Sequence, residues 1–406
     1  MEYIMEPNSN NTTNQMKQIY LDYAAATPVD TRVLSAMQPY FTEKFYNPSA
    51  SYLPAKHIRE EYEARKAVLA NSIGAKSPDL VITAGATESI NLAFTVLRNF
   101  QSAHCLILET EHAAVRESAK NLSSDYEKIK VDHSGLIDLG DLKSKIKDNT
   151  VLVSVALANN ELGTIQPLSD ISRILQEVRD QRLKTKNLTP IYLHSDASQA
   201  MNLIDLSIAR LGVDLLTINA AKVYGPKGIG ALYVVRGIRL SPITFGGGQE
   251  MGLRSGTENV PNLVGFSVAS ELAKKHLVSS RKQYQVLAKT FREIIEQKSK
   301  ITPLWLGNPK HQLVNFIPVC FDGLDAERLI FKLEDRGIYV STGAACAASK
   351  GQKSHVLSAI GLSDSEIAGS LRITLGKDTT IEDIKTAADN LAEVVNLEAR
   401  RLKLID

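Results

Sequence analysis

The chain has 406 residues, with 47 basic and 45 acidic side chains, so its formal net charge at pH 7 is only +2. This length can bury a large core and divide into two domains, while the balanced charge gives no indication of a nucleic-acid or anionic-membrane partner. The longest apolar run, Val151 to Ala158, is far too short to span a bilayer.

The first residues are polar and rich in asparagine, and they lack the basic and apolar regions of a signal peptide. We therefore predict that residues 1–17 form a disordered extension. After it, Ile19 to Pro28 predicts a short strand and a turn of small residues. Lys56 to Ile73 predicts an amphipathic helix, which Gly74 ends.

The next segment has the pattern of an anion site. A buried strand, Leu80 to Thr83, runs through Gly85 and Thr87 into a helix that continues from Ile90 to Leu97. At such a helix start, unpaired backbone N–H groups and the helix dipole favour a negative charge. An ordinary helix-capping turn is the alternative for this short motif.

Polar side chains follow the next two predicted strands. Leu106 to Leu108 leads to His112, and the apolar run from Val151 to Ala158 leads to Asn159 and Asn160. An imidazole at a crevice could stack on a cofactor ring or move a proton. The amides could bind a ring oxygen or a substrate carboxylate, although asparagine also serves ordinary turns.

The most informative pattern follows two further strands. Ile191 to Leu193 is followed by Asp196 and Gln199, and Asp214 to Ile218 is followed by Lys222. Open α/β sheets bind ligands beyond the carboxyl ends of their strands, so these side chains are expected in one crevice. Pyridoxal phosphate (PLP) needs these groups: a carboxylate to pair with its pyridinium nitrogen, an amide, and a lysine to form a Schiff base. A surface lysine before the tight GPKG turn is the alternative.

The alternation of strands and helices from Leu80 to Val234 predicts a mostly parallel sheet covered by helices. Residues 244–260 predict a glycine-rich loop, and we place a domain boundary near residue 275. The other predicted elements are helices at Leu168–Leu183, Pro261–His276, Ser279–Lys298, Ala326–Arg336 and Ile381–Leu402, and strands at Asn315–Phe321 and Ile338–Val340.

Two features of the C-terminal part indicate chemistry. Cys346 lies in the small-residue run STGAACAASKG, which cannot pack a core and could carry a reactive thiol in and out of a site. Cys105 and Cys320 lie at or within strands, where burial is expected. Arg372 lies between apolar neighbours in a strand, so its partner should be a carboxylate, of a substrate or of an internal acidic residue. The three cysteines lack metal-like spacing, and their odd, sparse number suits the cytoplasm, where we expect the protein.

In this order, the motifs resemble those of the cysteine desulfurases of iron–sulfur-cluster assembly and nitrogen fixation. That family belongs to the class V aminotransferase group of PLP fold-type I enzymes. The resemblance covers nearly the whole chain after the N-terminal extension, and the step from Cys346 to Ser354 resembles the longer cysteine loop of the family's first group. The ten motifs are LDYAAATP, TAGATESIN, ETEHAAV, NNELGTIQP, HSDASQ, AKVYGPKGIGALY, GGGQEMGLRSGTENVP, STGAACAAS, SHVLSAIG and SLRITLG.

The resemblance implies an α/β fold: a large domain with a mostly parallel seven-stranded sheet covered by helices, and a smaller α+β domain. Residues 34–275 would form the large PLP-binding domain, and residues 18–33 with 276–406 the small one. It also implies a homodimer, L-cysteine as substrate, and a sulfur acceptor such as an iron–sulfur scaffold protein or a tRNA-thiolation enzyme.

The resemblance also implies residue roles. Lys222 would hold PLP, and Cys346 would attack the sulfur of the substrate, leaving alanine and an enzyme persulfide. His112 would stack on the cofactor ring and help to move protons. The other positions would bind cofactor or substrate: Asp196 at the pyridinium nitrogen, Gln199 and Asn160 at the ring oxygen, Ala86, Thr87 and the partner subunit's Thr257 at the phosphate, and Arg372 with Asn160 at the substrate carboxylate.

Three positions depart from the family pattern. The family usually has Ser-x-His immediately before the lysine, and both side chains bind the phosphate, whereas this chain has Asn219 and Ala221. Asn219 could supply one N–H. Because a hydrogen bond to a charged group contributes about 1.5–3 kcal/mol, we predict weaker retention of PLP than is usual. Met251 stands where the loop often has arginine.

Two alternatives share part of this pattern. A selenocysteine lyase-like or desulfinase-like PLP enzyme would share the lysine and the aspartate, and the cysteine loop distinguishes it. A PLP-poor scaffold that only docks partner proteins would fit the altered phosphate contacts. The presence of Lys222, Asp196, His112, Cys346 and Arg372 argues against this second alternative.

Overall fold

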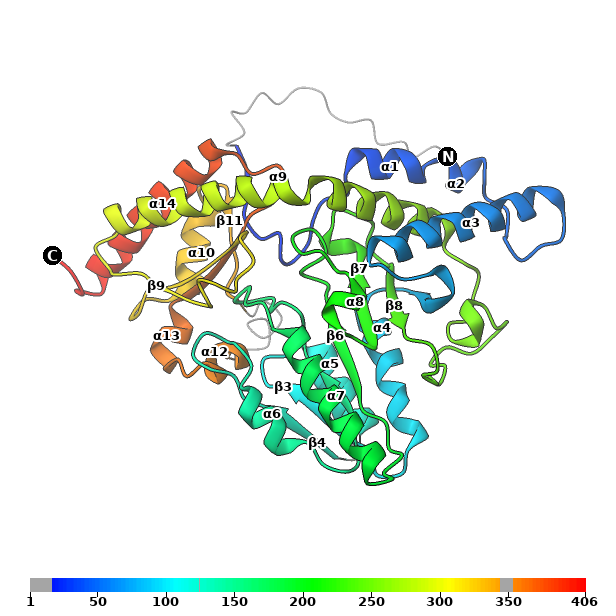
Figure 1. Cartoon of the computed structure of the whole chain (residues 1–406). Helices are drawn as coiled ribbons and strands as arrows, with labels where there is room; N and C mark the ends of the chain where they lie inside the picture. The colour runs from blue at the N-terminus through cyan, green and yellow to red at the C-terminus, as the bar shows by residue number, and fades with distance from the viewer. Residues whose placement is uncertain (1–16, 124, 344–352) are drawn as a thin grey trace.

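The computed structural model describes residues 17–123, 125–343 and 353–406. Its centre is a seven-stranded sheet with the order β2-β8-β7-β6-β5-β3-β4 (Figure 1). β8 pairs antiparallel with both β2 and β7, and the other neighbours are parallel, which confirms the predicted sheet. The strands are β2 (Leu80–Thr83), β3 (His104–Leu108), β4 (Asp125–Ile129), β5 (Thr150–Ser154), β6 (Tyr192–Asp196), β7 (Leu215–Asn219) and β8 (Gly230–Val234).

How deeply each strand is buried explains why some strands could be predicted from the sequence and one could not. β3 and β5 are buried along their whole length, and such strands appear as short apolar runs. β4 lies at the edge of the sheet, and its sequence DYEKI alternates between partly buried and exposed positions. We did not predict β4, because a charged edge strand carries no apolar run.

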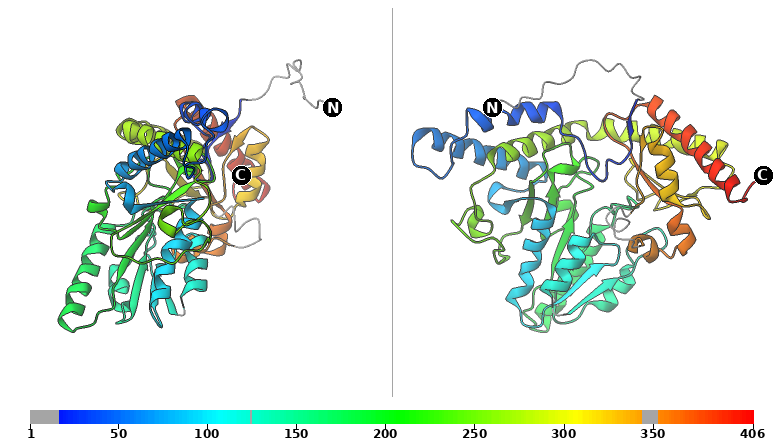
Figure 2. Two further views of the ribbon diagram at one scale, coloured as in Figure 1. Left: turned by 90° about the vertical axis from the view of Figure 1, so that its right-hand side faces the viewer. Right: turned by 180° about the vertical axis from the view of Figure 1, so that it is seen from behind.

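Helices cover both faces of this sheet. α4 and α5 pack on one face, and α7 packs on the other, as the edge-on view in Figure 2 shows. The helices and 3₁₀ turns of this part are α1 (Thr31–Met37), α2 (Pro39–Thr42), α3 (Leu53–Ser72), η1 (Ser77–Asp79), α4 (Ala86–Phe94), η2 (Thr95–Asn99), α5 (Ala113–Leu122), α6 (Leu139–Lys145), α7 (Leu168–Lys184), α8 (Ile208–Leu211), η3 (Ala220–Lys222) and η4 (Glu250–Gly252).

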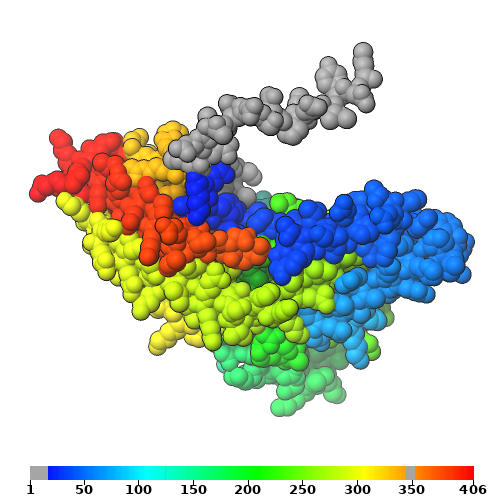
Figure 3. Space-filling view, turned by 90° about the horizontal axis from the view of Figure 1, so that it is seen from above, coloured from blue at the N-terminus to red at the C-terminus, as the bar shows by residue number. Residues whose placement is uncertain are grey.

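One long helix, α9 (Val260–Lys298), spans the molecule (Figures 1 and 3). Seen from above, it runs from the N-terminal helices to α14 (Ile381–Arg401). The predicted break between helices at 261–276 and 279–298 is wrong. The two intervening residues are Leu277 and Val278, and with no proline or glycine between the predicted helices nothing interrupts α9. The proposed domain boundary near residue 275 thus falls inside α9.

The C-terminal part carries two small sheets. β1 (Ile19–Tyr20) pairs in parallel with β11 (Ile338–Tyr339), so the beginning of the described chain lies against its C-terminal part. The second sheet is antiparallel, with the order β12-β10-β9. Its strands and the remaining helices are β9 (Leu304–Trp305), β10 (Phe316–Cys320), β12 (Ser370–Thr374), α10 (Ala326–Glu334), α12 (His355–Ala359) and α13 (Asp364–Ala368).

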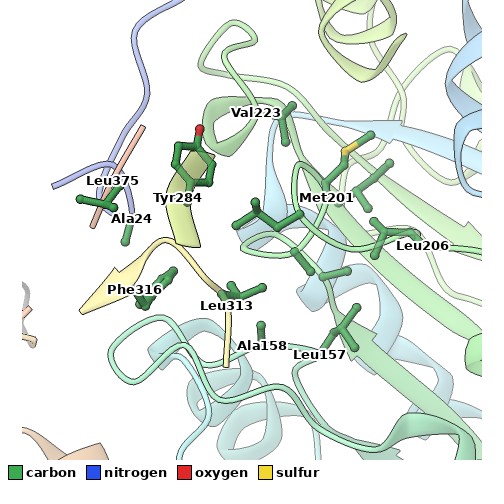
Figure 4. Close-up of a cluster of buried hydrophobic side chains, with 14 of the residues drawn as sticks. Ala24, Leu157, Ala158, Met201, Leu206, Val223, Tyr284, Leu313, Phe316 and Leu375 are labelled. Carbon is green, nitrogen blue, oxygen red and sulfur yellow. The ribbon is translucent and has the colours of Figure 1, made fainter. Parts of the chain in front are cut away.

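A buried apolar cluster joins the two parts next to the carboxyl end of the large sheet (Figure 4). Leu313 and Phe316 come from the C-terminal part, and Leu157 and Ala158 follow β5. Ala24, from the small-residue turn, also belongs to the cluster. This packing fixes the position of the turn beside the sheet. No helix among the described residues is long and apolar enough to cross a membrane.

Candidate active site

A cavity of about 1030 Å³ lies at the carboxyl end of the large sheet. Nine of the residues that the sequence analysis singled out line it: Ala86, Thr87, His112, Asn160, Asp196, Gln199, Asn219, Lys222 and Arg372. Thr257 is exposed and does not line this cavity, and its predicted place is the site of a partner subunit. Cys346 lies outside the described residues.

Lys222 reaches the cavity from the end of β7. After Asn219, the chain makes the short η3 turn, whose last residue is Lys222. Its Nζ donates hydrogen bonds to the carbonyl oxygens of Ala24, at 2.8 Å, and Ala25, at 2.5 Å. Gln199 Nε2 donates to the same Ala24 oxygen at 3.0 Å. The turn of small residues therefore brings backbone acceptors against both side chains.

Asp196 is the last residue of β6, the neighbour of β7 in the sheet. Its Oδ1 accepts hydrogen bonds from the backbone N–H of Ser198 at 2.9 Å and from the hydroxyl of Ser198 at 2.6 Å. Within the described part of the chain, Oδ2 accepts no hydrogen bond. One oxygen therefore holds the carboxylate in place, and the other can pair with a protonated ring nitrogen.

His112 and Asn160 lie at the ends of neighbouring strands, as predicted. His112 caps α5, and its Nδ1 accepts a hydrogen bond from Ala114 N–H at 3.1 Å, so a neutral ring carries its proton on Nε2. The two adjacent amides both line the cavity. The side chain of Asn159 is also used within the fold, because its Oδ1 accepts from the Glu161 and Leu162 N–H groups.

The start of α4 has the features of an anion site. Gly85 precedes it with φ +148°, and no side chain among the described residues caps the helix. A Cβ at Gly230 on β8 would come within 2.8 Å of the Gly85 backbone, so these two segments of the chain are in close contact. Ala86 and Thr87 line the cavity, where the helix N-terminus can receive a phosphate.

Two of the departures from the family pattern lie at the same cavity. Asn219 and Ala221 both line the cavity. The Oδ1 of Asn219 accepts a hydrogen bond from Ala221 N–H at 3.2 Å, so this amide also caps the η3 turn. Ala221 offers neither a hydroxyl nor an imidazole. The residues present therefore fit PLP, with fewer phosphate donors than the family usually has.

Arg372 is buried in β12 and holds several partners. Its Nη2 pairs with Asp22 Oδ1 at 2.7 Å, which is the internal acidic partner that the sequence allowed. Nη1 donates to the carbonyls of Asn160, at 2.9 Å, and Gly343, at 3.3 Å. Its Nε is buried and has no hydrogen-bond partner among the described residues.

Two buried acidic residues beside the cavity, Glu111 and Glu161, were not predicted from the sequence motifs. Glu111 accepts a hydrogen bond from Ala156 N–H at 2.6 Å through one oxygen, and burial raises the pKa of its carboxyl to about 8. Glu161 lines the cavity and accepts from the Ser354 hydroxyl at 2.6 Å. Both sit next to predicted residues, His112 and Asn160. That adjacency was the available signal, since one sequence cannot show that a charge is buried.

Cys105 and Cys320 are both buried, as predicted. Burial raises the pKa of both thiols, and that of Cys320 reaches about 11. A thiol with a raised pKa forms little thiolate, which is the nucleophilic form. Neither residue is a reactive cysteine, which leaves Cys346 as the candidate.

Comparison with known proteins agrees with this geometry. Residues 19–386 match the model of the family "Aminotransferase class-V". The cysteine desulfurase IscS 1 of Archaeoglobus fulgidus is 40% identical over 391 residues, which are 95% of this chain and 97% of that protein. The cysteine desulfurase IscS of Dictyoglomus turgidum is 37% identical over 93% of this chain and 95% of its own length.

Solved structures of related proteins have the same fold. A NifS-like protein superposes with a TM-score of 0.85 and 32% identity, over 94% of this chain and all of that one. A structure described as SspA in complex with cysteine gives a TM-score of 0.76 and 34% identity, over 88% of this chain and 99% of that one. This chain belongs to the class V aminotransferase family and, within it, to the cysteine desulfurases.

Proposed function

We propose that this cysteine desulfurase uses PLP to convert L-cysteine into L-alanine and that it carries the released sulfur as a persulfide on Cys346. The observation that carries the proposal is the convergence of Lys222, Asp196 and Arg372 on one cavity. The structure of SspA with cysteine, from a protein 34% identical to this chain, supports L-cysteine as the substrate.

The residues around the cavity would hold PLP from several sides. Lys222 would bind it covalently, Asp196 Oδ2 would pair with its ring nitrogen, and His112 would stack on the ring. When bound, PLP supplies an electron sink for negative charge that develops on the substrate carbon. The remaining contacts would come from Gln199 and Asn160 at the ring oxygen, and from Ala86, Thr87, Asn219 and the partner subunit's Thr257 at the phosphate.

The substrate carboxylate would lie against Arg372, whose Nε has no partner among the described residues. A guanidinium binds carboxylates well, as the pairing of its Nη2 with Asp22 shows. Once the carboxylate is fixed there, the thiol of the substrate faces the cavity. His112, with its proton on Nε2, would move protons at the substrate carbon.

The sulfur transfer needs no external oxidant. The Cys346 thiolate attacks the sulfur of the substrate, so an S–S bond forms while the C–S bond breaks. The electron pair of the C–S bond stays on carbon, which takes up a proton and becomes the methyl group of alanine. The persulfide can then pass its outer sulfur to an acceptor, for which an iron–sulfur scaffold protein or a tRNA-thiolation enzyme is our proposal. We further propose a cytoplasmic homodimer.

The test is a visible absorption spectrum of the purified protein before and after addition of L-cysteine, with alanine and sulfide assayed in parallel. We expect a cofactor band that shifts with cysteine, and alanine formation that is lost in Cys346→Ala while the band shift remains. If the enzyme turned over selenocysteine far better than cysteine, the lyase-like alternative would be favoured. Absence of a band even after added PLP would reject the proposal and favour a scaffold function.

A further inference from the structure

Glu161 is a carboxylate that the mechanism above does not use. It is 4% exposed, and its Oε2 accepts a hydrogen bond from the Ser354 hydroxyl at 2.6 Å. The Ser354 oxygen in turn accepts from Leu357 N–H at 3.1 Å, as the N-cap of α12. Because that N–H can only donate, the hydroxyl proton is available to Glu161. The bond length is typical of a hydroxyl that donates to an ionised carboxylate.

The same carboxylate lies against Gly343. A Cβ at position 343 would come within 2.8 Å of Glu161 Oε2, so a larger side chain would collide with it. The Gly343 carbonyl accepts from Arg372 Nη1 at 3.3 Å, and the carbonyl of Asn160, next to Glu161, accepts from the same nitrogen at 2.9 Å. Glu161 is thus bonded to Ser354 and lies close to Gly343, whose carbonyl Arg372 holds.

Gly343 and Ser354 flank the segment of the chain that carries Cys346. We propose that Glu161 is a positioning residue of the desulfurase reaction: it holds the Ser354 flank of this segment by a hydrogen bond and packs beside the Gly343 flank. The inference rests on the proposed function. It predicts that Glu161 affects the step in which Cys346 attacks the substrate sulfur, and not the binding of cysteine.

The burial of a charged group supports a specific role at this position. Removing a carboxylate from water costs free energy, and an apolar side chain would fill the same space without that cost. Arg372 offsets part of the cost through its positive charge, while burial raises the pKa of Glu161. Among the described residues, the hydrogen bond from the Ser354 hydroxyl and the positive charge of Arg372 favour a carboxylate at this position.

The experiment separates binding from sulfur transfer in the PLP-loaded enzyme. Cysteine binding is measured from the change in the cofactor spectrum, and alanine formation from a single turnover by rapid quench. The variants are Glu161→Ala, Glu161→Gln, Ser354→Ala and the double variant Glu161→Ala/Ser354→Ala. Ser363→Ala is the matched control, because Ser363 caps the neighbouring helix α13 and does not contact Glu161. Thermal unfolding and cofactor content verify the fold of each variant.

We expect Glu161→Ala and Ser354→Ala to slow alanine formation about 10- to 100-fold, since small displacements of a reacting group have effects of this size. Cysteine affinity should change less than about threefold. Glu161→Gln keeps an acceptor for Ser354 and should recover part of the rate. The double variant should be no slower than the slower single variant, because both remove one interaction. Ser363→Ala should have the wild-type rate.

Other results would contradict this inference but leave the proposed function unaffected. The inference would be rejected if the wild-type enzyme forms alanine and Glu161→Ala forms it at the same rate. A loss of cysteine affinity at an unchanged rate, or effects that multiply in the double variant, would also reject it. If Glu161→Ala does not fold, Glu161→Gln and Ser354→Ala decide the question. A wild-type enzyme that forms no alanine would instead reject the proposed function.

Discussion

At the scale of single residues, Arg372 shows how an internal ion pair and a ligand site can share one side chain. Asp22 orients the guanidinium through Nη2, and the Nε–H remains without a partner among the described residues. Lysine at this position would keep the charge, but it has no pair of parallel N–H groups. Arg372→Lys should therefore raise the KM for L-cysteine about tenfold or more, the equivalent of one charged hydrogen bond, with a smaller effect on kcat.

Steady-state kinetics of alanine formation measures this difference. Arg328→Lys is the matched control, since Arg328 pairs with Glu398 away from the cavity, and its kinetics should not change. A fall in kcat of about tenfold with an unchanged KM would show that Arg372 does not bind the substrate in the ground state.

Glu111 predicts a pH dependence of stability. Burial raises the pKa of its carboxyl to about 8, above the value of about 4.3 in an unfolded chain. A raised pKa in the folded state means that its stabilising contribution is complete below pH 4.3 and is lost as the pH rises toward 8. Glu111→Gln, which stays neutral, should therefore gain stability relative to wild type between pH 5 and pH 9.

The melting temperature of the PLP-loaded protein across this pH range tests the prediction. Glu393→Gln is a suitable control, because Glu393 is largely exposed in its pair with Arg336. The difference in melting temperature between Glu111→Gln and wild type should increase with pH. A difference that stays constant with pH would show that Glu111 is ionised at low pH like an ordinary carboxyl.

At the scale of elements, the start of α4 and the η3 turn both line the cavity. The uncapped α4 start supplies backbone N–H groups, whereas η3 offers Asn219, whose Oδ1 already accepts from Ala221 N–H. We predict that Asn219→Ser/Ala221→His binds PLP about tenfold or more tightly, because it adds a hydroxyl and an imidazole to this site. Loss of PLP during dialysis, followed by absorbance, measures the difference. Wild-type protein that keeps its full PLP content through long dialysis would contradict the prediction.

The elements also show which parts of the structure the sequence could predict. Apolar runs identify strands that are buried on both faces, so β6 and β7 were predicted together with the residues at their ends, Asp196 and Lys222. The edge strand β4 was missed, because its exposed face carries charges. The continuity of α9 was missed because a polar stretch in a long helix resembles a loop when its packing is unknown.

The candidate site divides in a similar way. Residues that act through their chemical type, such as Lys222 and Arg372, could be named from motifs and order. Glu161 could not, because its importance depends on a contact with Ser354, far away in the sequence. The role of Asp22 as the partner of Arg372 also comes from tertiary contact alone. The predicted roles of Cys346 and Thr257 remain predictions.

At the scale of the whole molecule, the N-terminal helices present an apolar surface. Large apolar side chains are exposed along the segment from α1 to the start of α3, at the end of the molecule farthest from α14 (Figure 3); they are Leu34, Phe41, Phe45, Tyr52 and Leu53. A concentration of exposed large apolar side chains is typical of protein interfaces. It fits the predicted homodimer, in which the exposed Thr257 would reach the cavity of the other subunit.

Mixed dimers provide the decisive test of this arrangement. We predict that Lys222→Ala and Thr257→Ala chains are each impaired alone but form one complete site when they pair. In that mixed dimer, the Thr257→Ala chain supplies Lys222, and the Lys222→Ala chain supplies Thr257 across the interface. Differently tagged chains, co-expressed and purified in two steps, should regain about half of the wild-type PLP content, bound as tightly as in wild type. If Thr257 acted within its own chain, no subunit of the mixed dimer would have both residues, and PLP retention would equal that of Thr257→Ala alone.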